Sequence, residues 1–159
     1  MNSVEINVGF EIREIIERYL YSFDSRNVDL LSSCFTDDAD GKFFSGDPNE
    51  IVLKGRRMIA DYFLNSPSPR ASNHTLCNMH LRINGETAEA DAFGTTHRVS
   101  MEGEVFVRGL RYKSGLILTN EGWRISNFIH TVLWQHNALA VVPHIPTSGR
   151  YSSGTADPT

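Results

Sequence analysis

The chain has 159 residues and a formal net charge of −4, and 40% of its residues are hydrophobic and 21% charged. These values fit one globular domain with a core of its own. The basic residues are scattered, which disfavours nucleic-acid binding, and no apolar run approaches the ~20 residues of a membrane span.

The two ends of the chain differ from its middle in composition. The first residues, MNSVEINVGFEI, lack the basic and apolar segments of a secretory signal, so we expect a cytoplasmic protein. We interpret residues 1–9 as a leader and residues 10–146 as a single domain. Residues 147–159 are small and polar, which predicts a flexible tail.

Motifs for metals and nucleotide cofactors are missing from the sequence. None of the six histidines forms a His-x-x-x-His pair, and no glycine-rich phosphate loop is present. The acids Asp37, Asp38 and Asp40 lack the glycine and glutamate of a calcium loop. Cys34 and Cys77 stand in apolar surroundings and are expected to be buried, reduced thiols. We therefore expect no metal and no cofactor.

Apolar residues recur at intervals of three and four in the first part of the domain, which is typical of one face of an α-helix. They are Phe10, Ile12, Ile15, Ile16, Tyr19, Leu20 and Phe23. Asp24 follows at the inner end of this stripe and opens a polar break that runs to Asn27. A carboxylate in that position either caps a neighbouring group or faces a cavity.

A second short helix is predicted after the polar break. Ser25 or Asn27 can cap it, and its apolar residues lie within residues 28–35. The pair Asp37-Asp38 is expected to end it, so we interpret the acids from Asp37 to Asp40 as a helix end and turn rather than as a site.

Short strands are predicted at residues 42–44 and 50–54. A third helix should cover residues 56–64, because Pro67 and Pro69 stop it. Its inner side is expected to carry Met58, Ile59, Tyr62 and Phe63.

The second half of the chain is strand-like. Strands are predicted at residues 74–83, 86–99, 105–119 and 123–135, and Asn84-Gly85 is typical of a two-residue hairpin turn. Helices followed by an antiparallel meander indicate an α+β fold in which the helices pack on one face of the sheet. A curved sheet would leave a pocket between the two layers, which is the usual place for a ligand.

Several motifs add to this order of elements. They are the acid that closes the first helix, the Phe-x-Asp-Asp-Ala of residues 35–39, the helix after Lys54-Gly55, and Gly-Trp-Arg-Ile-Ser at 122–126. Over residues 10–137 the chain resembles the NTF2-like superfamily, and within it the SnoaL-like branch. The resemblance implies a cone, in which a strongly curved antiparallel sheet wraps around about three N-terminal helices.

Two enzymes of this branch, scytalone dehydratase and hexachlorocyclohexane dehydrochlorinase, share a pair of residues. Each pairs an Asp at the end of the first helix with a His at the start of the strand after the third helix. The matching positions are Asp24 and His74. In those enzymes the His takes a proton from carbon and the Asp orients and charges it, so the resemblance implies a catalytic Asp–His dyad here.

The match with those two enzymes is incomplete. The second active-site His of scytalone dehydratase falls near Asp91 or Ala92, where no His stands. Phe23 replaces a Tyr of that enzyme, and Tyr19 replaces a Lys of the dehydrochlorinase. Neither substrate is therefore expected, and elimination, isomerisation and cyclisation all remain open.

Other side chains are candidates for binding the substrate. Tyr19, Tyr112 and His130 can orient its oxygens, although Tyr19 fits ordinary core packing as well. Asp91 is either an acid in the cavity or an outward charge. The remaining candidates for the pocket wall are the aromatic residues Phe23 and Trp134, and His80 and His97 are weaker ones.

Two functions from different classes fit these features. The first is a cofactor-free lyase, isomerase or cyclase that acts on a small hydrophobic oxygenated molecule, for example in natural-product assembly. The second is a non-catalytic module that binds a ligand or a protein through the same cone. Epoxide hydrolysis also occurs in this fold, but the required acids and arginine cannot be placed.

A homodimer or another homo-oligomer is also expected, because many members of this fold pair through the outer face of the sheet. The residues that would support such a face, if exposed, are Leu116, Leu118, Ile125 and Ile129.

Overall fold

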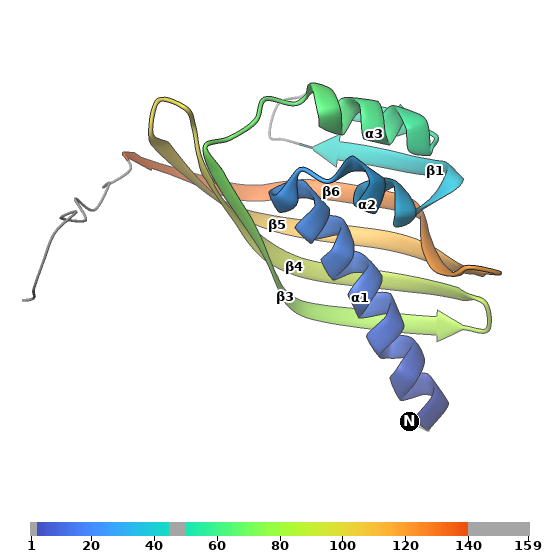
Figure 1. Ribbon diagram of the computed structural model, residues 1–159. Helices are drawn as coiled ribbons and strands as arrows, with labels where there is room; N and C mark the ends of the chain where they lie inside the picture. The colour runs from blue at the N-terminus through green and yellow to red at the C-terminus, as the bar shows by residue number, and fades with distance from the viewer. Residues whose placement is uncertain (1–2, 45–49, 140–159) are drawn as a thin grey trace, which may run out of the picture.

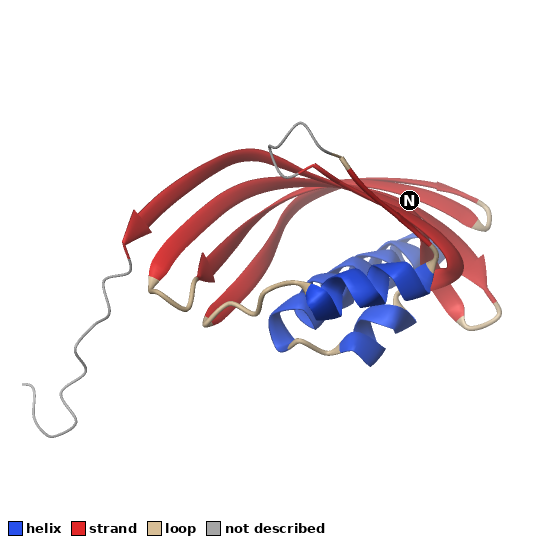
Figure 2. Cartoon of the chain, turned by 90° about the horizontal axis from the view of Figure 1, so that it is seen from above, coloured by secondary structure: helices blue, strands red, loops and turns tan. Residues whose placement is uncertain are grey.

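The computed structural model describes residues 3–44 and 50–139, in which three helices lie on the concave side of one curved six-stranded sheet (Figure 1, Figure 2). The elements are α1 (Ser3–Ser25), α2 (Val28–Ser33), β1 (Phe35–Phe44), β2 (Ile51–Lys54), α3 (Arg56–Asn65), β3 (Ala71–Asn84), β4 (Thr87–Val99), β5 (Glu104–Thr119) and β6 (Gly122–Leu139). The strand order is β2-β1-β6-β5-β4-β3, and the sheet does not close. The predicted α+β cone is confirmed. The predicted tail, residues 147–159, lies outside the described residues.

Helix α1 packs its apolar stripe against the sheet. Its buried residues are Ile12, Ile15, Ile16, Tyr19 and Leu20. The helix already begins at Ser3, so most of the segment interpreted as a leader is helical. Phe10 was expected inside, but its side chain is 68% exposed. No helix of the described segments is long and apolar enough to cross a membrane.

Helix α1 ends in a tight, hydrogen-bonded turn. The N–H of Asn27 donates to the carbonyl of Ser22 at 3.1 Å, and the N–H of Arg26 donates to that of Phe23 at 3.4 Å. This is a Schellman end, with Arg26 in the left-handed region at φ 53°. The Asn27 side chain then accepts the N–H of Leu30 and caps α2. Of the two predicted caps, Asn27 is confirmed.

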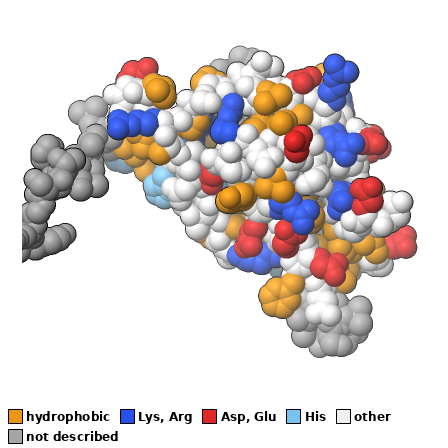
Figure 3. Space-filling model, in the orientation of Figure 1, with side chains coloured by type: hydrophobic (Ala, Val, Ile, Leu, Met, Phe, Trp, Pro, Cys, Tyr) orange, Lys and Arg blue, Asp and Glu red, His pale blue; other side chains and the backbone are white. Residues whose placement is uncertain are grey.

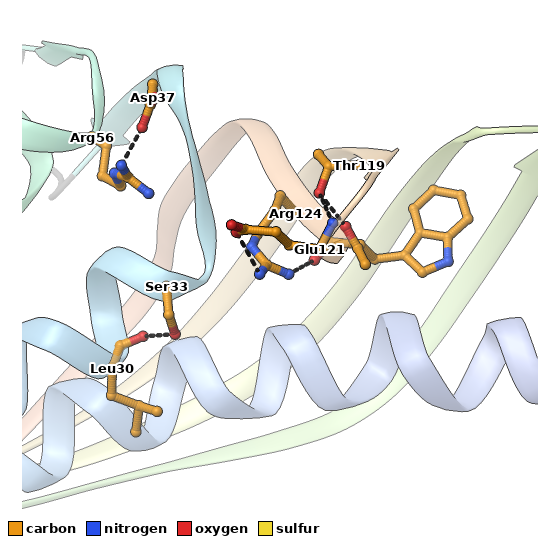
Figure 4. A network of polar contacts seen from close by, with 9 residues as sticks. Leu30, Ser33, Asp37, Arg56, Thr119, Glu121 and Arg124 are labelled. Atoms are coloured by element: carbon orange, nitrogen blue, oxygen red, sulfur yellow. Dashed lines mark hydrogen bonds and ion pairs between the residues drawn. The ribbon is translucent and has the colours of Figure 1, made fainter.

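The segment after α2 differs from the prediction. The helix ends at Ser33, and residues Phe35–Phe44 form strand β1, so Asp37 and Asp38 lie in a strand and not at a helix end. β1 runs parallel to β6 and antiparallel to β2. Phe35 and residues 40–44 pair with the sequence-distant β6, and the two acids lie in the irregularity between these paired segments. Figure 4 shows Asp37 facing Arg56 at the start of α3, with which it forms an ion pair.

Helix α3 and the β3–β4 hairpin are close to their predicted positions. Ile59 and Phe63 are buried as expected, but Met58 is 47% exposed. In the hairpin Asn84 still pairs with Thr87, so the two loop residues are Gly85 and Glu86, one position later than predicted.

Two irregularities change the alternation of β6. Val132 pairs with Leu110 whereas Trp134 pairs with Gly109, so one residue of β6 is skipped and the alternation shifts. A second shift lies between Ile125 and Asn127. The side chains of β6 therefore do not alternate strictly between the two faces of the sheet.

The second shift removes the expected outer apolar face. Leu116 and Ile125 are each only 1% exposed and belong to the core under the helices, whereas Leu118 is 42% exposed. The four residues named above do not form one exposed surface. Association of two copies stays a prediction without support from this set.

The two cysteines differ in burial. Cys34 is buried at the end of α2, whereas Cys77 on β3 is exposed, so its expected burial is wrong. Both are free thiols.

Candidate active site

The side chains of Asp24 and His74 are in direct contact. Nδ1 of His74 lies 2.7 Å from Oδ1 of Asp24, and the main-chain N–H of His74 donates to Oδ2 at 2.6 Å. The hydroxyl of Ser72 donates to Oδ1 at 2.8 Å. Ser72 and His74 are two positions apart on β3, so they face the same side of the strand. The tight end of α1 and the start of β3 thus meet at one carboxylate.

The environment of Asp24 keeps it ionised. Burial raises the pKa of its carboxyl, but the hydrogen bonds from the side chain and main chain of His74, the His74 charge and the Ser72 hydroxyl together lower that pKa below its ordinary value. A carboxylate can only accept hydrogen bonds, so the facing Nδ1 of His74 carries a proton. In the neutral ring this leaves Nε2 as a free base.

His74 opens onto a cavity of about 130 Å³. Its walls come from the end of α1, from α3, and from β1, β3, β4, β5 and β6, at the end of the sheet that extends beyond the helices (Figure 2). Phe23, Leu110 and Val132 give it an apolar side. Thr96, directly across from His74 on β4, also lines it, and its hydroxyl is buried with no hydrogen-bond partner among the described residues.

His130 lines the same cavity as a neutral ring. Burial, together with the charges of His74 and Arg108, lowers its pKa to about 3. Its ring packs against Tyr112 and Phe43 with centroid distances of 5.0 and 5.3 Å. Its Nδ1 is buried without a hydrogen-bond partner in the described part of the chain. A polar ligand atom can satisfy this nitrogen.

Tyr19 and Tyr112 lie in the core and do not line the cavity. Burial raises the pKa of both phenols, so both stay protonated. Each hydroxyl is buried and finds no hydrogen-bond partner within residues 3–44 and 50–139. Tyr19 packs edge-on against Phe23 and Phe35 at 5.2 and 5.4 Å. The predicted role of the two phenols in orienting a substrate stays a prediction.

Two predicted site residues lie elsewhere. Asp91 forms two hydrogen bonds with Arg111, at 2.8 and 2.6 Å, beside a separate surface depression, which fits the outward charge. Trp134 is 51% exposed and does not line the cavity. A Cβ on Gly109 would lie 2.1 Å from its indole ring, so Trp134 covers Gly109 on the face opposite to Arg108. The register shift in β6 puts it there.

The sequence did not point to several residues of the site. Ser72 could have been found, because it stands two positions before His74 on the same strand. Thr96, Arg26, Arg98 and Arg108 also line the cavity, but no local pattern distinguishes them from surface residues. They meet only because the antiparallel register brings Thr96 beside both His74 and Arg108.

Comparison with known proteins places the chain in a family. Residues 6–129 match the SnoaL-like domain, and the chain belongs to this family. The resemblance inferred from the sequence is thereby confirmed.

Relatives of known sequence or structure fit this assignment. An uncharacterised protein of Mycobacterium tuberculosis, Rv2910c, is 27% identical over 139 residues, which cover 85% of this chain and 92% of the relative. The hexachlorocyclohexane dehydrochlorinase LinA-type3 from Novosphingobium barchaimii LL02 has a TM-score of 0.76 at 17% identity, with 87% of this chain and 97% of that chain covered. A candidate scytalone dehydratase from Novosphingobium aromaticivorans DSM 12444 has a TM-score of 0.74 at 14% identity, with coverages of 88% and 95%. At such identities the structural likeness shows the fold alone.

Proposed function

We propose that the protein is an acid–base enzyme, a lyase, isomerase or cyclase, that uses the Asp24–His74 dyad and no cofactor on a small, largely apolar oxygenated molecule. The observation that carries this proposal is the 2.7 Å contact between Asp24 and His74 at the wall of a cavity. A carboxylate so placed orients the ring and stabilises the imidazolium that forms when the ring takes a proton.

In the proposed reaction Nε2 of His74 removes a proton from a carbon beside a carbonyl. The electron pair of the C–H bond moves toward the carbonyl oxygen, which gains negative charge. Thr96 and His130 line the cavity, and the Thr96 hydroxyl and Nδ1 of His130 are buried without a hydrogen-bond partner in the described part of the chain. After a rotation of its side chain, either residue can donate a hydrogen bond to that oxygen. Loss of a leaving group then completes an elimination, and return of the proton to another atom completes an isomerisation.

The close contact of the dyad favours an enzyme over a non-catalytic binding module. A binding module would not require the two side chains to be in contact or shielded from solvent. The side chains of His74 and Asp24 are 9% and 19% exposed. Two dehydratase- and dehydrochlorinase-type structures share the fold, which adds support from analogy alone.

Proton transfer at carbon can be tested without knowing the natural substrate. The protein is incubated in D2O with a panel of cyclic and aromatic carbonyl compounds that carry an acidic C–H, and exchange at carbon is followed by 1H NMR. We expect exchange of at least one compound, and a loss of about 10²–10⁴-fold in His74→Ala and Asp24→Asn, the range typical of general acid–base help.

His80→Ala is the matched control. His80 stands on the same strand, exposed and outside the cavity, and its replacement should leave the exchange rate unchanged. An exchange rate that is equal in the wild type and His74→Ala would contradict the proposal.

A further inference from the structure

The cavity wall carries three arginines and no acidic residue. Arg26, Arg98 and Arg108, here called the arginine cluster, come from the end of α1, from β4 and from β5. None of them forms an ion pair within the described parts of the chain, where their hydrogen-bond acceptors are main-chain carbonyls and the amide of Gln135. The chain as a whole is acidic, with a net charge of −4, so this concentration of positive charge is local.

Arginines elsewhere on the surface are mostly paired with acidic side chains. Over the face that α1 covers, acidic and basic side chains are interspersed (Figure 3). There Arg13 pairs with Glu17 and Arg18 with Glu14 along the helix. On the convex face of β5, Arg111 pairs with Asp91. An arginine on this protein therefore usually has an acidic partner, and the cluster at the cavity lacks one.

Arg26 occupies a backbone position that suits glycine. Its φ of 53° lies in the left-handed region, which disfavours every residue with a side chain, and the equivalent position of a helix end is most often glycine. Its guanidinium lies 4.6 Å from the ring centre of Phe63 and is held at the cavity wall. A strained residue beside a cavity points to a use for its side chain.

Arg98 and Arg108 stand where the cavity meets an outer groove. Both line the inner cavity and also an adjoining groove of about 280 Å³. Burial lowers the pKa of both guanidinium groups. The charge of Arg26 lowers that of Arg98 further and outweighs the opposite effect of Tyr62 and Asp24, and the charge of Arg98 lowers that of Arg108. Their described hydrogen bonds use only part of the five N–H donors of each group. An anion between them would relieve the repulsion and use the free donors.

We propose that the arginine cluster binds a carboxylate of the substrate, so that the ligand is an organic carboxylic acid whose uncharged part reaches His74. This deepens the proposed function and rests on it for the role of His74. The planar fork of an arginine matches a carboxylate or a phosphate equally well. Glu102, on the wall of the groove, disfavours the doubly charged phosphate more strongly, so we assign a carboxylate.

The test compares acids with their amides. Benzoate, 4-hydroxybenzoate and cinnamate are titrated into the protein by calorimetry at low salt, beside benzamide, 4-hydroxybenzamide, cinnamamide and phenyl phosphate. We expect at least one acid to bind about tenfold more tightly than its amide, which is the size of one charge-assisted hydrogen bond. If no acid binds more tightly than its amide, the inference is overturned. If phenyl phosphate binds more tightly than every acid, the carboxylate assignment is overturned.

Variants then locate the anion. Arg98→Gln with Arg108→Gln should weaken binding of the acid about tenfold or more and leave that of the amide unchanged. Arg111→Gln, three positions after Arg108 but paired with Asp91 on the convex face, should bind the acid like the wild type. Circular dichroism checks that the double variant is folded. If the folded double variant binds the acid as tightly as the wild type does, the proposed anion site is overturned.

The same titrations separate this inference from the proposed function. His74→Ala should still bind the acid, because the anion lies on the arginines and not on the dyad. Selective binding of acids without any proton exchange at carbon would therefore contradict the enzyme alone. Proton exchange on neutral compounds only, without selectivity for acids, would contradict the arginine cluster alone.

Discussion

Asp24 is placed against a local electrostatic preference. It lies in the last turn of α1, where the partial negative charge of the helix end disfavours a carboxylate by about 0.3–1 kcal/mol. Hydrogen bonds from Ser72 and from the side chain and main chain of His74 offset this. Contacts from the start of β3 therefore stabilise the ionised carboxylate of Asp24. The same contacts hold the imidazole ring of His74 in place.

Arg26 gives a second test at the scale of one residue. Arg26→Gly should be about 1 kcal/mol more stable to unfolding than Arg26→Ala, because only glycine relieves the left-handed backbone. Both variants should bind the acid that the wild type binds most tightly with a lower affinity than the wild type. Denaturant unfolding and calorimetry measure the two effects. A glycine variant that is less stable than the alanine variant, or that keeps full affinity, would show that Arg26 serves another purpose.

His130 predicts a pH dependence of stability. Its pKa is about 3 in the folded protein against an ordinary 6.5, so below about pH 6.5 the unfolded chain binds a proton that the folded chain does not. Folding stability should fall as the pH drops from 6.5 toward 3, by up to about 1.4 kcal/mol per pH unit from this group.

Denaturant unfolding of His130→Gln between pH 7 and pH 4 checks this. The variant lacks the titrating group, so the wild type should lose stability relative to it as the pH falls. His80→Gln, at an exposed position, should follow the wild type. Parallel curves for the wild type and His130→Gln would contradict the burial of His130 as a neutral ring.

At the scale of whole elements, the helices and the hairpins of the second half were predictable because their signals are local. The spacing of apolar residues found α1 and α3, and the Asn84-Gly85 turn found the β3–β4 hairpin to within one position. Strand β1 was missed over most of its length because it is built on parallel pairing with β6, which no local pattern reveals.

The irregularities of β6 explain the misplacement of Trp134. A one-residue shift reverses the faces of every residue beyond it, so Trp134 was expected in the pocket and lies outside it, whereas His130 precedes the shift and lies inside. The Asp24–His74 contact was predicted from the resemblance, since nothing in the spacing of the two residues shows it. The arginine cluster could not be predicted without the register of β4 and β5, which brings Arg98 and Arg108 to the same cavity.

At the scale of the molecule, the helices cover only part of the concave face (Figure 2). The cavity lies between the ends of α1 and α3 and the strands that face them, and His74 lines it where α1 stops against β3, with Asp24 behind its ring. Whether two copies associate through the convex face stays a prediction.

We propose that Asp24 holds His74 in the form that leaves Nε2 free to take a proton. Long-range 1H–15N NMR of the imidazole rings, with His74 assigned from His74→Ala, reads this directly in the free protein. We expect the neutral His74 ring to carry its proton on Nδ1, and we expect Asp24→Asn to abolish that preference. A His74 ring whose proton lies on Nε2 in the wild type would contradict the account.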